Sequence, residues 1–84
     1  MPRYLISYDL TKDSADAYKA LGEELTRLGA KRVLLSQWAL RNAATAEQLR
    51  DHLWGYMDAN DRVLVSDLSA GWASMRALTD INDI

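Results

Sequence analysis

The stretch that decides the fold is residues 4–9, which read YLISYD. Its first five residues are mostly apolar or aromatic, and the run lies between Pro2 and a polar stretch over residues 9–14. This pattern is typical of a short buried strand. The strand ends on a carboxylate, Asp9, at the expected rim of a sheet, where ligands of α/β folds commonly bind. Asp9 is therefore the first candidate for a functional residue.

The next segment has the period of an amphipathic helix. Its apolar residues recur at spacings of three and four, at Ala15, Tyr18, Leu21, Leu25 and Leu28. Asp13 is placed to cap the first turn, and Gly29 stands where a glycine commonly follows the last turn. A helix is predicted between these two residues.

The rest of the chain repeats this alternation of strand and helix. Residues 31–42 favour β-structure but are long for one strand, and Ser36-Gln37 predicts a kink or a break into two strands. Thr45 and Gln48 match a capping box that opens a second helix, and residues 62–68 read as a further buried strand. The order β-α-β-β-α-β predicts an α+β, ferredoxin-like sandwich with two helices on one face of an antiparallel sheet.

A chain of 84 residues is long enough for one domain. We expect this domain to span residues 1–78 and the polar residues 79–84 to form a frayed tail. Residues 72–77 suggest one or two helical turns, with an edge strand as the alternative.

Composition excludes several classes of site. The chain has no cysteine and a single histidine, His52, so it has no disulfide, thiolate site or cluster of histidines. The net charge of −2 and the lack of a Lys/Arg cluster argue against strong nonspecific nucleic-acid binding by one chain. Without a signal-like segment or a run long enough to cross a membrane, we expect a cytoplasmic protein and no membrane partner.

Apolar residues point to both faces of the later strands. Val33 and Leu35 alternate with Leu34, and Val63 and Val65 alternate with Leu64. Because two helices can cover only one face, the other would be an apolar interaction surface. Homodimerisation is the simplest way to cover it, since twofold dimers are the commonest oligomers.

Asp9 is a hard oxygen ligand of the kind that Mg²⁺ or Mn²⁺ accepts, although a loop or helix-capping role is the alternative. A dimer could bring two copies of Asp9 together. Arg3, Arg32, Arg41 and Arg62 lie at strand ends and could bind phosphates, with surface ion pairs to strand-end carboxylates as the alternative. Aromatics next to Arg41 or Arg50 could stack bases, although packing is the simpler explanation.

Three short motifs carry a family resemblance, at residues 4–10 (YLISYDL), 28–33 (LGAKRV) and 35–38 (LSQW). In order and spacing they resemble the small CRISPR-associated adaptation protein, an endoribonuclease-like family. The chain is more similar still to outlying relatives of that family, the SinR-like proteins and the VapD-type toxin ribonucleases. The resemblance implies a ferredoxin-like homodimer in which Asp9 faces its symmetry mate and holds a metal for phosphodiester cleavage. It also matches Ser36 to a family serine that is followed by an aromatic residue.

Two functional hypotheses follow. The first is a dimeric nucleic-acid-processing protein, a magnesium-dependent endoribonuclease with Asp9 as catalytic and metal-binding residue. RNA or DNA would be its substrate, bound by Arg32, Arg41 and Ser36. The second is a non-catalytic dimeric scaffold or protein-interaction module. The acidic balance favours the second, as do residues 13–16, which read DSAD where the family has basic residues.

Overall fold

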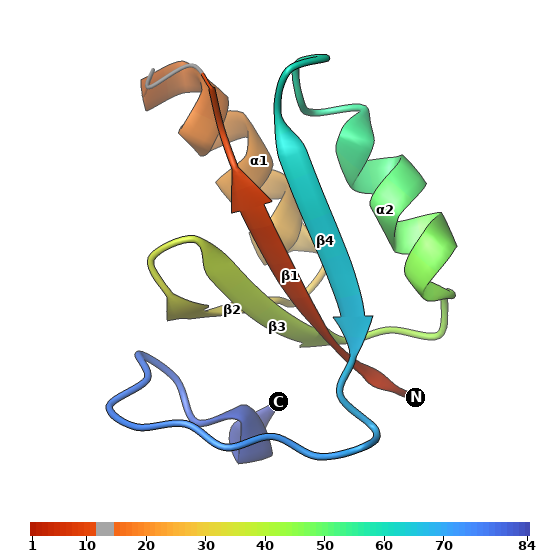
Figure 1. Ribbon diagram of the computed structural model, residues 1–84, viewed down its shortest axis with the longest axis vertical. Coiled ribbons are helices and arrows are strands. Elements are labelled where there is room, and N and C mark those ends of the chain that lie inside the picture. Colours follow the sequence, from red (N-terminus) through yellow and green to blue (C-terminus); the bar gives the residue numbers. More distant parts are fainter. Residues whose placement is uncertain (12–14) are drawn as a thin grey trace.

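The structure is a computed structural model that describes residues 1–11 and 15–84. One sheet stands in front of two helices, and the chain after the last strand runs along the lower end of that sheet (Figure 1). The elements are, in chain order, β1 (Arg3–Asp9), α1 (Ala15–Arg27), β2 (Lys31–Leu34), β3 (Gln37–Arg41), α2 (Ala46–Trp54), β4 (Arg62–Asp67) and the 3-10 helix η1 (Ile81–Asp83).

The sheet has the strand order β2-β3-β1-β4, and every neighbouring pair is antiparallel. β1 lies in the centre, where Ile6 is the partner of Trp38 on one side and of Val65 on the other. The predicted break in the second β-segment is confirmed, because a turn at residues 35–36 separates β2 from β3. Order and connections together define a ferredoxin-like α+β fold, as the sequence predicted.

Side chains of β1 alternate between the two faces of the sheet, as the pleat requires. Tyr4, Ile6 and Tyr8 are buried toward the helices, and the hydroxyl of Tyr8 accepts a hydrogen bond of 3.0 Å from Trp38 Nε1. The buried residues of this layer are Tyr4, Ile6, Tyr8, Leu21, Leu25, Ala30, Trp38, Leu40, Leu49 and Leu53. This cluster is the main core, and it leaves the odd-numbered residues of β1 on the other face, called here the open face.

Local signals at the helix ends behave as predicted. The Thr45 hydroxyl accepts from the backbone N–H of Gln48, and the Gln48 side chain accepts from the N–H of Thr45, which completes the capping box of α2. Gly29 follows α1 with a φ of 86°, a conformation that favours glycine. The predicted cap at Asp13 lies outside the described residues. Within the part of the chain described here, neither helix has the length and apolar character to span a membrane.

The chain after β4 covers the lower half of the open face. Ile81 and Leu68 are buried there against Val33 and Ala39, and Trp72 packs onto this second cluster. The N–H of Leu78 donates to the carbonyl of Val33 at 2.8 Å. Residues 68–84 are called the strap below.

Residues 79–84, expected to be a frayed tail, carry part of this packing in the structure. Residues 72–77 form neither a helix nor a strand, and the only helical turn of the strap is η1. The expected turns are absent because the apolar residues of the strap serve as separate anchors on the sheet and do not form one face of a helix. Trp72 is one of these anchors and packs against the second cluster.

Candidate functional site

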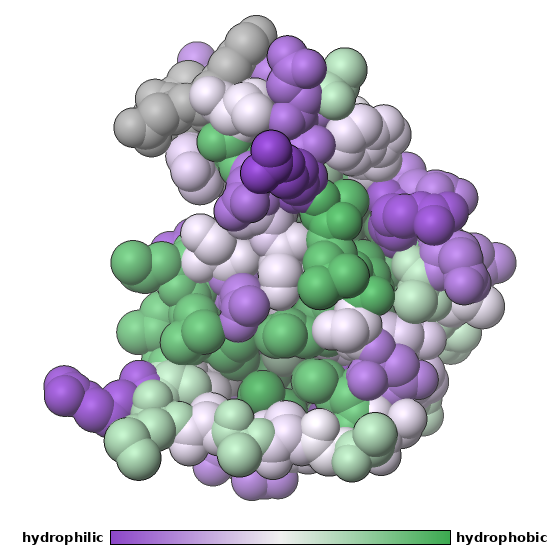
Figure 2. Space-filling model, in the orientation of Figure 1, coloured by the Kyte–Doolittle hydropathy of each residue, from purple (hydrophilic) through white to green (hydrophobic). Residues whose placement is uncertain are grey.

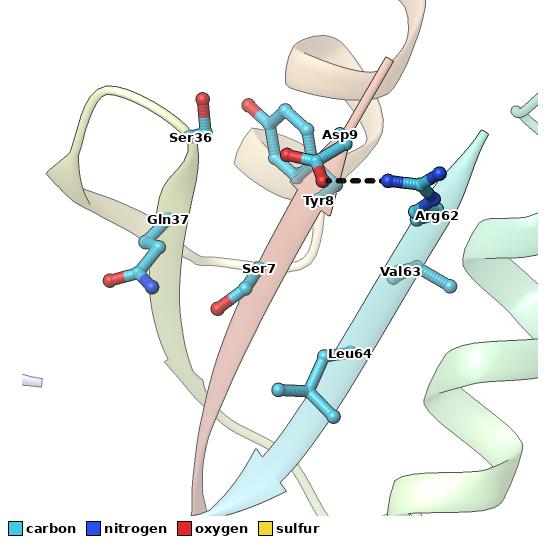
Figure 3. A pocket seen from close by; sticks show the side chains of 8 residues that line it. All are labelled: Ser7, Tyr8, Asp9, Ser36, Gln37, Arg62, Val63 and Leu64. Atoms are coloured by element: carbon cyan, nitrogen blue, oxygen red, sulfur yellow. Dashed lines mark ion pairs between the residues drawn. The ribbon is translucent and has the colours of Figure 1, made fainter. Parts of the chain in front are cut away.

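A shallow pocket of about 260 Å³ opens on the open face at the end of β1 (Figure 3). Ser7 and Asp9 come from β1, Ser36 and Gln37 from the turn into β3, and Arg62 and Leu64 from β4. Residues 7 and 9 face this side because odd positions of β1 point away from the helices. The pocket thus combines one carboxylate, one guanidinium and three neutral polar side chains.

Asp9 faces a cation from the neighbouring strand. Asp9 and Arg62 are register partners in the β1–β4 ladder, and Arg62 Nη1 lies 3.9 Å from Asp9 Oδ2. Both side chains are more than three-quarters exposed, so solvent screens their attraction and the pair is worth at most about 1 kcal/mol. Each group can therefore exchange its partner for a ligand at little cost.

The oxygen donors around Asp9 are of the type that Mg²⁺ and Mn²⁺ prefer, since carboxylate, hydroxyl and amide oxygens are hard ligands. One chain supplies a single carboxylate to the pocket, and the described residues contain no group of three His, Cys, Asp or Glu side chains that could hold a metal. The pocket of one chain therefore supplies half of a binding site for a hydrated cation. A second carboxylate would complete it.

The structure brings one of the three predicted substrate-binding residues to Asp9. Ser36 lines the pocket, and its carbonyl accepts from the N–H of Tyr8 at 3.3 Å. Arg32 lies on the helix side of β2, with its guanidinium carbon 4.9 Å from the ring centre of Trp38. Arg41 pairs with Arg3 at the opposite end of the sheet, where its Nε donates to the carbonyl of Ile84 at 2.6 Å.

The arginine at the pocket is Arg62, one of four strand-end arginines in the sequence. Composition does not distinguish it from the other three, because all of them lie at strand ends. Its place beside Asp9 follows from the register between β1 and β4, which are more than 50 residues apart in the chain. Register of that range cannot be read from local sequence.

Asp61, a buried carboxylate just before β4, links the two loops next to the pocket. Its side chain accepts from the N–H and the hydroxyl of Thr11, at 2.7 and 2.9 Å, and from the N–H of Asp58 at 2.8 Å. These bonds join the loop after β1 to the loop before β4. They hold the ends of the two strands that carry Asp9 and Arg62 side by side.

A second buried carboxylate, Glu24, links the two helices on the far side of the sheet. It accepts from Arg27 Nε at 2.5 Å and from Arg27 Nη2 at 2.6 Å, and it also pairs with His52 of α2. Hydrogen bonds from Arg27 and His52 lower the pKa of Glu24 from 4.5 to about 2. His52 is a partly exposed surface histidine, and this cluster belongs to the packing of the helices.

No protein-family model matches the chain. By its fold and its pocket, the chain is a ferredoxin-like α+β domain. Its pocket pairs a carboxylate with a guanidinium on the sheet face opposite the helices.

Proposed function

We propose that the chain is a homodimeric nucleic-acid-processing protein, a metal-dependent endoribonuclease that acts at Asp9 and its symmetry mate. The observation that carries the proposal is the position of Asp9 beside Arg62, 3.9 Å apart in a pocket with two serines on the open face. Phosphodiester cleavage needs a ligand for a divalent cation and a donor for the phosphate oxygens. A carboxylate and a guanidinium are suited to these two tasks.

The apolar part of the open face supports the dimer. Leu64 is 61% exposed and Leu34 is 48% exposed on this face, where Figure 2 shows hydrophobic residues gathered over the sheet. Leu34 and Leu64 stand at the two ends of one row across the sheet, with Gln37 and Ser7 between them, and exposed leucines on an uncovered sheet face favour association. Because Leu64 lines the same pocket as Asp9, a twofold axis close to Leu64 would bring two Asp9 carboxylates together.

Four side chains of the pocket have a role in this proposal. The two Asp9 carboxylates would hold Mg²⁺ or Mn²⁺, which supplies Lewis-acid stabilisation of the charge on the scissile phosphate. Arg62 would exchange its weak pairing with Asp9 for hydrogen bonds to a phosphate oxygen. The hydroxyls of Ser7 and Ser36 would donate to the sugar or the phosphate and so orient the strand.

The test combines a cleavage assay with a measurement of mass. We expect the wild-type chain to sediment as a dimer and to cleave single-stranded RNA with Mn²⁺, and Asp9→Asn to reduce cleavage at least 100-fold while it remains a dimer. Asp16→Asn, which removes an exposed carboxylate from α1, is the matched control and should cleave normally. Full cleavage by the Asp9→Asn dimer would disprove the proposed role of Asp9, and a monomer at micromolar concentration would disprove the shared site.

The second candidate is a non-catalytic dimeric scaffold or protein-interaction module. It is favoured by the single carboxylate that each chain supplies to the pocket and by the net charge of −2. Salt-dependent retention of labelled RNA or DNA without degradation would support a nucleic-acid scaffold. A dimer that binds neither at low salt would support the protein-interaction module.

A further inference from the structure

Arg62 faces a second concavity in addition to the Asp9 pocket. A groove of about 500 Å³ lies between α2 and the start of β4 and is lined by Arg50, Asp51, Trp54, Asp61, Arg62 and Val63. Because Arg62 lines both this groove and the Asp9 pocket, the two concavities are neighbours. A flexible ligand bound to Arg62 in the pocket can therefore continue into the groove.

Trp54 is the unusual side chain of this groove. It is the last residue of α2, is 41% exposed, and belongs to neither apolar cluster. The other two tryptophans have packing roles, Trp38 in the main core and Trp72 beneath the strap. Trp54 thus presents an aromatic surface that the folded chain does not use.

The charged groups of the groove leave two guanidiniums available. Arg50 lies four residues before Trp54, so both side chains share one face of α2. Its Nε lies 2.9 Å from Asp51 Oδ1, but both side chains are more than half exposed, which makes the pair weak and exchangeable. The Asp61 carboxylate is buried and accepts from Thr11 and Asp58, and these bonds are directed into the protein.

We infer that this groove binds single-stranded nucleic acid that continues from the Asp9 pocket, with one base stacked on Trp54 and flanking phosphates on Arg50 and Arg62. The inference rests on the proposed function and adds a groove that holds the strand beyond the Asp9 pocket. An aromatic face that shares a groove with two guanidiniums suits a single strand, which offers both bases and phosphates. A duplex keeps its bases stacked on each other and cannot offer one to Trp54.

The binding test uses a fluorescein-labelled 12-nucleotide oligouridylate in EDTA, with anisotropy as the readout. We expect Trp54→Leu to weaken binding about tenfold, since stacking of one base is worth roughly 1–3 kcal/mol. Tyr18→Leu is the matched control, because Tyr18 is an aromatic residue of similar exposure, 39%, on α1, and it should bind like the wild type. Arg50→Gln should reduce the slope of log K against log salt by about 0.7.

Tryptophan emission gives a second readout that does not depend on the leucine variant folding. The unlabelled oligonucleotide should quench the emission of the wild type, and Trp54→Phe should lose the quenching while it retains most of the affinity through its ring. Equal binding by the wild type, Trp54→Leu and Tyr18→Leu would overturn the groove and leave the proposed function standing. Equal competition by a duplex would overturn the single-stranded substrate, and a wild type that binds no RNA or DNA at low salt would overturn both proposals.

Discussion

The two ends of the open face carry similar residues and use them differently. At the lower end, Arg3 and Arg41 both donate through Nε to the carbonyl of Ile84, at 2.8 and 2.6 Å, and Arg3 also lies over the ring of Trp72. At the upper end, Arg62 faces the exposed carboxylate of Asp9 across 3.9 Å. The strap accounts for this difference, because it reaches the first pair of arginines and stops short of the second.

The comparison distinguishes arginines that stabilise the fold from an arginine that can still bind a ligand. A guanidinium that donates to a carbonyl of its own chain has exchanged water for a fixed partner and contributes to stability. A guanidinium paired with an exposed carboxylate contributes little and remains open to ligands. Residue type and strand-end position are the same in both cases, and the covering segment decides the role.

The largest expected effect is at the covered end. Ile81→Ala should lower the free energy of unfolding by about 2–5 kcal/mol, because Ile81 is buried against the sheet and its truncation leaves a cavity. Urea unfolding followed by far-UV circular dichroism measures this change. Leu78→Ala is the control, since Leu78 is exposed in the same segment. Equal stability of Ile81→Ala and the wild type would mean that the strap does not hold the lower half of the face.

A smaller effect distinguishes the two kinds of arginine. Arg3→Gln should cost about 1–2 kcal/mol, because a part-buried, charge-assisted hydrogen bond to Ile84 is lost. Arg62→Gln should change stability by less than about 0.5 kcal/mol, as expected for an exposed pair. Thermal or urea unfolding of the two variants side by side tests the comparison directly. If Arg62→Gln proved the more destabilising, the available arginine would be a structural one.

On the helix side of the sheet, Glu24 is expected to affect the stability of the fold at acidic pH. The pKa of Glu24 is about 2 in the folded chain and ordinarily 4.5, so the folded state favours the ionised carboxylate. This contribution to stability is complete above about pH 4.5 and is lost as the pH falls toward 2. Glu24→Gln should therefore flatten the fall in stability between pH 4.5 and 2, as measured by urea unfolding at several pH values. Glu47→Gln, at an exposed glutamate of α2, is the control, and an unchanged slope in Glu24→Gln would contradict the assignment.

Much of the fold could be predicted from local signals. The capping box at Thr45 and Gln48, the break at Ser36-Gln37 and the alternation over residues 4–9 all act within a few residues, and the structure contains each of them. The strap could not be predicted in the same way. Ile81 lies in a mostly polar stretch, and it becomes an anchor only because the sheet presents an apolar face within its reach.

The candidate site, like the fold, has features that local sequence predicts and features that it does not. The sequence by itself determined the order of strands and helices and the place of Asp9 at the end of a strand, since periodicity and capping are short-range properties. Only the tertiary structure decided that Arg62 faces Asp9 while Arg41 holds the strap and Arg32 packs on Trp38. The reason is physical: strand register and the covering of a sheet face are set by contacts between residues far apart in the chain, where side chains of the same type meet different partners.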